Sequence, residues 1–179
     1  MKKIVLNPIS MFIIGAILGV LSKLFDIHSE VLGNIFSEFA IWILFGVLIS
    51  IYSKTKRKAM INIFLFCIGM LLTYYITAEI TNSVYGLAFV KGWTIFACIS
   101  PLFAYFTWMS KENGVFPIMI KIGITGVSLF CSLFLVSLNI FDLIINIILI
   151  YFLFIKKIDR INVKQIIGDL LFMINFIFL

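Results

Sequence analysis

Long apolar stretches recur along this chain, and only short polar segments separate them. Hydrophobic residues make up 63% of the 179 residues, whereas charged residues make up 12%. A soluble domain of this length needs more polar side chains than that to cover its surface. The sequence therefore predicts an all-α integral membrane protein, a polytopic helix bundle. No polar linker divides the chain, so we expect a single transmembrane domain over residues 1–179.

Four of the apolar stretches predict separate membrane-crossing helices, because about 20 helical residues cross a hydrocarbon core about 30 Å thick. The second of them begins with polar turns that contain Asn34, Ser37 and Glu38. The fourth could start near Tyr85, which would place Lys91 inside it. The expected spans cover residues 9–24, 31–52, 60–77 and 93–109.

Residues 116–155 form a mostly apolar stretch that is too long for a single span. A helix of that length would measure about 60 Å, twice the hydrocarbon thickness. The polar interruption from Ser137 to Asp142 predicts that the chain folds back there. This gives a fifth span over residues 116–138 and a sixth over residues 140–155.

The tail, residues 156–179, combines a basic segment with a mostly apolar stretch of about fourteen residues that contains Asp169 and Asn175, which is short for a span. We expect an interfacial helix there, with a short, tilted seventh span as the alternative.

The basic residues predict the orientation. Eleven of the fourteen lie at the N-terminus, in the second and fourth loops, and in the tail, whereas Lys23 and Lys91 lie on the opposite side. Cytoplasmic loops of membrane proteins carry an excess of Lys and Arg. Six spans with both termini in the cytoplasm fit this asymmetry. The abundance of Ile, Phe, Lys and Asn is typical of AT-rich genomes and favours a bacterial plasma membrane as the location.

Polar residues near the outer ends of the spans are the candidates for a binding site. Glu38 lies inside the second span, and Tyr75 and Glu79 share one face of the third. A carboxylate within a membrane is costly, so it is a functional candidate by default. With Lys91 and Trp93, these residues could line a polar pocket that opens to the outside, or they could form structural ion pairs only. Asp26, His28 and Glu30 are expected to be ordinary residues of an outer loop.

Gly15 and Gly19 on the first span form a pair of small residues that lets another helix approach closely. Internal packing is the simpler expectation, and docking of a partner protein is the other.

The sequence offers no catalytic site. A single histidine excludes metal sites built from several histidines, and the three cysteines have no metal-binding spacing. No nucleophile-elbow, P-loop or dinucleotide-binding motif occurs. We expect no enzyme activity, cofactor or metal. The positive charge is explained by the loops and does not indicate nucleic-acid binding.

In size, span number, orientation and outward-facing polar cluster, the chain resembles the substrate-binding S components of bacterial energy-coupling-factor vitamin transporters. The resemblance implies a six-helix subunit that binds a small solute from outside. It also implies that Gly15 and Gly19 dock onto a membrane partner. The alternative is an uncharacterised small multi-pass protein, an accessory or immunity protein that acts through helix–helix contacts. The lipid bilayer is the expected surrounding in both cases.

Overall fold

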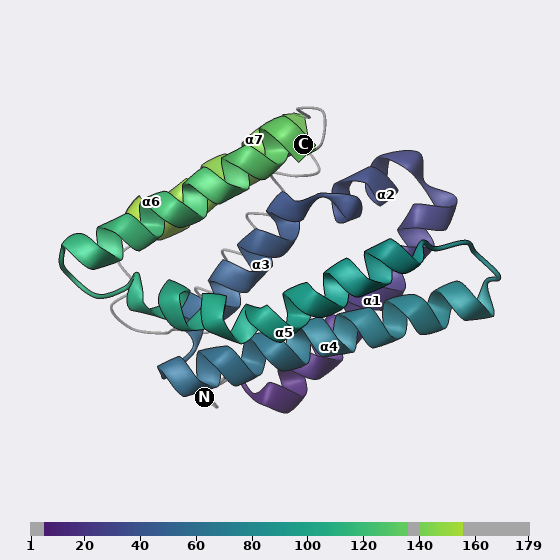
Figure 1. The fold of residues 1–179 in the computed structure, drawn as a ribbon, viewed down its shortest axis with the longest axis horizontal. Helices are drawn as coiled ribbons and strands as arrows, with labels where there is room; N and C mark the ends of the chain where they lie inside the picture. The colour runs from purple at the N-terminus through teal and green to yellow at the C-terminus, as the bar shows by residue number, and fades with distance from the viewer. Residues whose placement is uncertain (1–5, 136–139, 156–179) are drawn as a thin grey trace, which may run out of the picture.

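The computed structural model describes residues 6–135 and 140–155, with the side chains of residues 30, 31, 37, 134 and 135 left aside (Figure 1). All regular structure in these ranges is helical. The elements are α1 (Pro8–His28), α2 (Glu30–Ser37), α3 (Phe39–Tyr52), α4 (Lys56–Ile80), α5 (Leu87–Met109), α6 (Val115–Phe130) with its π-helical continuation η1 (Cys131–Leu135), and α7 (Ile140–Ile150) with η2 (Tyr151–Ile155).

Four helices are long and apolar enough to cross a membrane: α1, α4, α5, and α6 continued to Leu133. Two further apolar helices, α3 and the Ile140–Ile155 segment, are shorter. The 14 residues of α3 measure about 21 Å, against a hydrocarbon core of about 30 Å. The predicted helical architecture is confirmed for the described residues, and the count of six spans stays a prediction.

Among the described helices, α1 and α4 pack against each other most extensively. A Cβ atom added at Gly15 would overlap the backbone carbonyl of Phe66, and one added at Gly19 would overlap that of Met70. The hydroxyl of Thr73 on α4 donates to the carbonyl oxygen of Ala16 on α1, at 2.7 Å. The small face predicted on the first span therefore serves packing inside the protein.

The second predicted span is not one helix, which corrects the prediction of a continuous helix over residues 31–52. It breaks at Glu38, whose backbone is extended (φ −74°, ψ 138°), into α2 and α3. The break frees the carbonyl groups at the end of α2. The indole N–H of Trp42 compensates by donating to the carbonyl oxygen of Phe36, at 2.8 Å.

The chain reverses direction between α6 and α7. The amide of Asn146 on α7 donates to the hydroxyl of Ser132 on η1 at 3.1 Å. In one continuous helix these residues would be about 21 Å apart. The predicted fold-back of residues 116–155 is therefore confirmed. Its predicted turn falls largely on residues 136–139, outside the described part, as does the whole predicted tail, 156–179.

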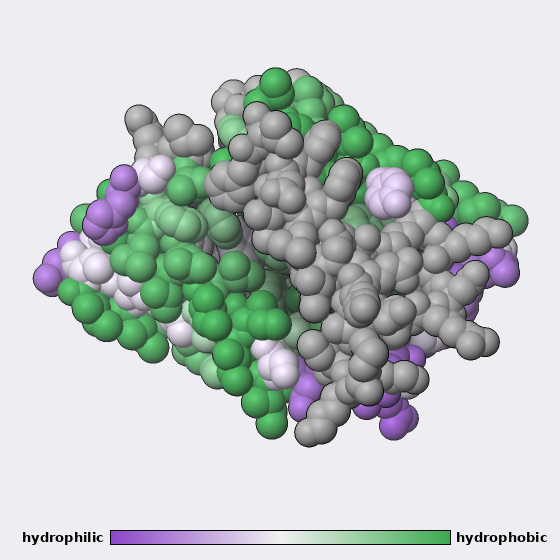
Figure 2. Space-filling model, turned by 180° about the vertical axis from the view of Figure 1, so that it is seen from behind, coloured by the Kyte–Doolittle hydropathy of each residue, from purple (hydrophilic) through white to green (hydrophobic). Residues whose placement is uncertain are grey.

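The bundle has two chemically different ends. The basic end, as we call it, comprises the α3–α4 loop, the first turn of α4 and the segment after α5, which carry Lys54, Lys56, Arg57, Lys58 and Lys111. The start of α1 lies there too, because the Asn62 amide donates to the Leu6 carbonyl oxygen. The opposite end holds the end of α1 and the loop 81–86. Among the residues coloured in Figure 2, hydrophobic side chains cover most of the visible surface, and hydrophilic ones lie mainly toward the left and right ends.

Candidate functional site

The end opposite the basic end contains a cavity of about 340 Å³ with mainly aromatic walls, which we call the aromatic cavity. That volume lies near the lower limit of small-molecule sites, about 300–1,000 Å³. Helices α1, α2, α3, α4 and α5 and the loop 81–86 all contribute to it. Its lining comprises Phe36, Trp42, Tyr74, Tyr75, Tyr85, Phe89 and Trp93, together with Ser22, Asp26, Met70, Leu71, Val84 and Gly86.

The break at Glu38 places two of the aromatic walls. Phe36 lies in the last turn of α2 and Trp42 in the first turn of α3, and their ring centroids are 6.1 Å apart in an edge-to-face contact. The Trp42–Phe36 hydrogen bond fixes the indole orientation. Without the break the two residues would lie six positions apart on one straight helix, pointing in different directions.

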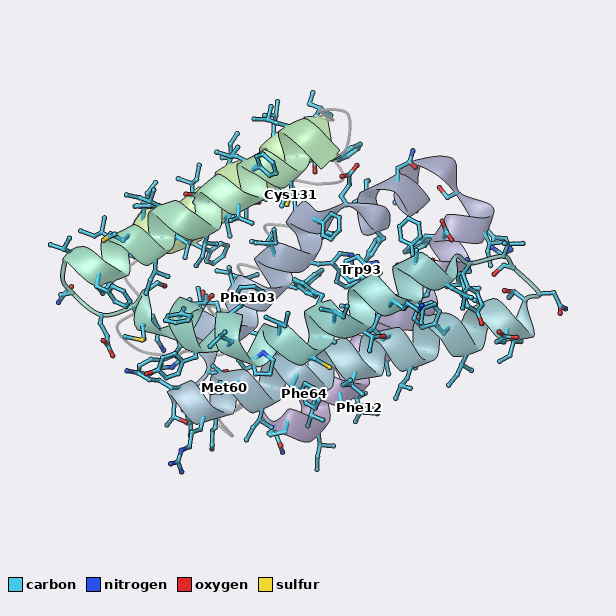
Figure 3. All side chains as sticks on the ribbon, in the orientation of Figure 1. Phe12, Met60, Phe64, Trp93, Phe103 and Cys131 are labelled. Atoms are coloured by element: carbon cyan, nitrogen blue, oxygen red, sulfur yellow. The ribbon has the colours of Figure 1, made fainter. Side chains whose placement is uncertain are left out.

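Trp93 supplies the wall from α5. Its ring stacks on Phe39 with centroids 5.3 Å apart and meets Trp42 edge to face at 6.5 Å. Figure 3 shows Trp93 between α5 and the junction of α2 and α3. Contacts of this type hold both indoles in fixed orientations, because aromatic pairs favour stacked and edge-to-face geometries.

Asp26 brings the charge to the cavity. Its Oδ2 lies 2.8 Å from the Lys23 ammonium and accepts a hydrogen bond from the Tyr74 hydroxyl at 3.3 Å. The Lys23 ammonium also lies 5.2 Å from the centre of the Tyr74 ring. The Lys23 side chain is 3% exposed and that of Asp26 is 39% exposed. A buried cation is thus neutralised by a carboxylate that reaches the cavity surface.

The loop 81–86 carries Tyr85 at the cavity edge. The Tyr85 hydroxyl donates to the Glu79 carboxylate, and this hydrogen bond raises the pKa of Tyr85. Tyr85 also contacts Tyr75, with ring centroids 5.3 Å apart. Asn82 adopts a left-handed conformation (φ 49°), which Asn tolerates better than most residues, and it turns the chain toward α5.

The five residues predicted for the site do not all meet. Tyr75 and Trp93 line the aromatic cavity. Glu79 does not line the cavity, but its carboxylate accepts a hydrogen bond from Tyr85, which does. Lys91 is exposed on α5 and lies outside the lining. Glu38 is buried but also lies outside the lining.

Glu38 belongs instead to a separate buried polar cluster between α3, η1 and α7. The carboxylates of Glu38 and Asp142, 5% and 0% exposed, are close enough to interact electrostatically. Asn146, at 3% exposure, donates to the Asp142 carbonyl oxygen at 2.8 Å as well as to Ser132. The Asn146–Ser132 hydrogen bond joins α7 to η1, and Glu38, at the start of α3, lies near Asp142 of this hairpin.

A third polar cluster closes the basic end. The backbone carbonyl of Ser53 accepts hydrogen bonds from the Trp108 indole at 2.9 Å and the Lys111 ammonium at 3.2 Å. The Lys111 ammonium lies 4.1 Å from the Trp108 ring centre, and burial lowers the pKa of Lys111 to about 8. Lys56 forms an ion pair with Glu112 at 3.4 Å. This cluster joins the α3–α4 loop to the end of α5.

Sequence reasoning missed Asp26, which it assigned to an outer loop. The structure places Asp26 inside α1, one turn after Ser22, on the side that faces α4. The spacing of Ser22 and Asp26 was a usable signal, because residues four apart share one helix face. The identity of their partner, Tyr74 on α4, depends on how α1 and α4 pack and has no local signal.

The side chains that line the aromatic cavity are of the kinds that bind a small molecule. Its polar groups are one carboxylate and several hydroxyls, which can fix the orientation of a ligand between apolar walls. Among the described residues there is no group of three or more metal-ligating side chains.

Fold and cavity together define an all-helical protein with four helices able to cross a membrane and an aromatic cavity at one end. The chain belongs to a family of unknown function, DUF6518, whose model matches residues 1–116. All the residues that line the aromatic cavity fall inside that match. No curated protein and no solved structure matches the chain.

Proposed function

We propose that this protein is a multi-pass protein of the bacterial plasma membrane that binds a small solute in the aromatic cavity, as a transporter-type subunit. The observation that carries the proposal is the cavity itself. Its walls come from five helices and the loop 81–86, and its polar groups are few, with Asp26 as the charged one among the described lining residues. An apolar hollow with a few convergent polar groups is the usual form of a small-molecule site.

The proposed topology has six spans with both termini in the cytoplasm, α3 and α7 with η2 serving as short spans. The basic end then faces the cytoplasm, in keeping with the positive-inside rule. The aromatic cavity, at the other end, opens to the outside, where a solute arrives. The separation of the basic end from the cavity end across the membrane is supported by α4, which has Lys56 at one end and Asn82 at the other.

Gly15 and Gly19 do not support docking onto a partner protein, because α4 already occupies their face. Small residues without a described neighbour occur on α6 instead, where a Cβ added at Gly123 or Gly126 would meet no atom of residues 6–135 or 140–155 within 4 Å. That observation favours the second candidate function, an accessory or immunity protein that acts through helix–helix contacts.

A pair of α5 variants tests solute binding. Phe89 lines the aromatic cavity and is 70% exposed, whereas Phe103, on the same helix and 53% exposed, lies outside the lining. Native mass spectrometry of the purified protein should show a bound small molecule. We expect Phe89→Ala to reduce its occupancy and Phe103→Ala to leave it unchanged.

Two results would contradict the proposal. One is the absence of any bound or bindable solute in a screen by thermal shift and tryptophan fluorescence. The other is equal loss in the two variants, which would mean that the bound molecule sits elsewhere. Photo-crosslinking from residue 123 to another protein, with no solute found, would favour the accessory function.

A further inference from the structure

The aromatic cavity has a charge preference that can be derived from its walls. Among the described residues that line it, Asp26 alone carries a charge, and that charge is negative. Seven aromatic side chains supply most of the remaining surface. We infer that the cavity selects a small organic ammonium ion. The inference rests on the proposed function and names the class of solute that this site binds.

Aromatic walls favour a cation because the face of each ring is electron-rich. A cation within about 6 Å of a ring centroid is attracted to the ring face, most strongly where water is excluded. The edge-to-face contacts of Trp42 with Phe36 and with Trp93 turn neighbouring rings at steep angles to one another. Rings arranged in this way surround a space from several directions, which suits a rounded ammonium group.

The protein already holds one ammonium ion by the same chemistry. Lys23 is bound between the Asp26 carboxylate, at 2.8 Å, and the Tyr74 ring, at 5.2 Å from its centre. Both of those groups also line the cavity. Lys23 and Tyr74 both contact Asp26 through Oδ2, so Oδ1 has no hydrogen bond to either of them. This oxygen can accept a hydrogen bond or supply negative charge to a ligand.

Other solute classes fit less well. A carboxylate or phosphate ligand would meet Asp26 and the electron-rich ring faces. Lys23, the described cation paired with Asp26, is 3% exposed and lies outside the cavity lining, whereas the Asp26 side chain is 39% exposed and lies within it. A neutral apolar solute would gain burial but no charge interaction. A positive charge is therefore the property that the walls distinguish best.

Two pairs of probes separate charge from shape. The first is choline and 3,3-dimethyl-1-butanol, its neutral carbon isostere. The second is 2-phenylethylamine, protonated at pH 7, and neutral 2-phenylethanol. Binding to the full-length protein in nanodiscs is measured by isothermal titration calorimetry. We expect at least one ammonium probe to bind tenfold or more tightly than its neutral partner.

Variants locate the effect in the cavity. Phe89→Leu keeps an apolar side chain but removes a ring face, and it should weaken the ammonium probe by about threefold or more while sparing the neutral one. Asp26→Asn should weaken the ammonium probe by about tenfold. Glu112→Gln, an acid at the basic end, is the matched control and should bind like the wild type. If Asp26→Asn fails to fold, because it leaves Lys23 unneutralised, Phe89→Leu still decides.

Different outcomes would overturn the ammonium preference and the proposed solute-binding function. Equal binding of charged and neutral partners in both pairs would overturn the ammonium preference and leave a solute cavity in place. Binding of anionic or neutral solutes alone, sensitive to Phe89→Ala, would do the same. The absence of binding by every probe and every solute in the wider screen would overturn the proposed function itself.

Discussion

At the scale of single residues, two glycines on different helices stand in opposite surroundings. Gly15 faces the backbone of α4 so closely that a methyl group has no room, whereas a methyl group at Gly123 would meet no atom of the described part of the chain within 4 Å. The clash at Gly15 is with backbone atoms, so a change of side-chain rotamer cannot relieve it. The helices themselves would have to separate.

The first prediction compares the same substitution at these two positions. Gly15→Ala should destabilise the protein by about 1–3 kcal/mol, because overpacking forces α1 away from α4. Gly123→Ala should be neutral, or stabilising by up to about 1 kcal/mol, since alanine favours helix over glycine. Thermal unfolding in detergent, followed by circular dichroism, measures both. Equal stability of the two variants would contradict the packing described for Gly15.

The second prediction concerns Lys111. Its pKa falls from 10.5 to about 8 in the folded protein, so between these values the unfolded chain binds the proton more strongly. The contribution of Lys111 to stability therefore rises as the pH increases through 8. From pH 7 to 9.5, the free energy of unfolding of the wild type should rise by about 1 kcal/mol relative to that of Lys111→Gln, after allowing for solvent screening.

Unfolding curves at several pH values measure that gain as the difference between wild type and variant. The difference removes contributions from other groups that titrate in the same range. Lys54→Gln, at an exposed lysine of the same end, is the control and should run parallel to wild type. A constant difference between wild type and Lys111→Gln across the range would mean that the buried environment of Lys111 is not retained in solution.

At the scale of helices, the apolar runs were enough to place most of the elements. The predicted span over residues 60–77 corresponds to α4, which extends further at both ends because Thr55 caps it and polar residues continue the helix. Lys91 lies inside α5, as the longer version of the fourth span anticipated. Polar residues at helix ends have no hydropathy signal of their own. The apolar pattern therefore predicts the central residues of a helix better than the residues at which it begins and ends.

The break at Glu38 could not be predicted from the same pattern. Asn34, Ser37 and Glu38 signalled polar turns, but a continuous helix with a polar start was equally compatible with them. The break is stabilised by contacts distant in sequence or specific in geometry, namely the Trp42–Phe36 hydrogen bond and the packing of α3 against α7. For that reason the cavity walls at Phe36 and Trp42 were missed, whereas Tyr75 and Trp93, on regular helices, were chosen.

At the scale of the whole molecule, the cluster of basic residues after α3 and α5 and the aromatic cavity lie at opposite ends of one apolar bundle. Large hydrophobic side chains are exposed along α1, α4, α5 and α6, as expected of a surface that faces lipid. The basic residues at one end and the aromatic cavity at the other give the bundle a direction. Binding from outside requires that this direction match the membrane orientation, so the topology decides whether the cavity can meet an external solute.

The last prediction tests that orientation in intact cells. Cys67, Cys98 and Cys131 are replaced by serine, and single cysteines are introduced by Lys54→Cys at the basic end and Asn82→Cys at the cavity end. Both positions are exposed, so access depends on the side of the membrane alone. A membrane-impermeant maleimide should label Asn82→Cys in intact cells. Lys54→Cys should react only after the membrane is permeabilised, because positively charged loops stay in the cytoplasm. The reverse pattern would turn the aromatic cavity toward the cytoplasm and end the case for uptake of an external solute. Labelling of both positions from outside would contradict the membrane crossing of α4 itself.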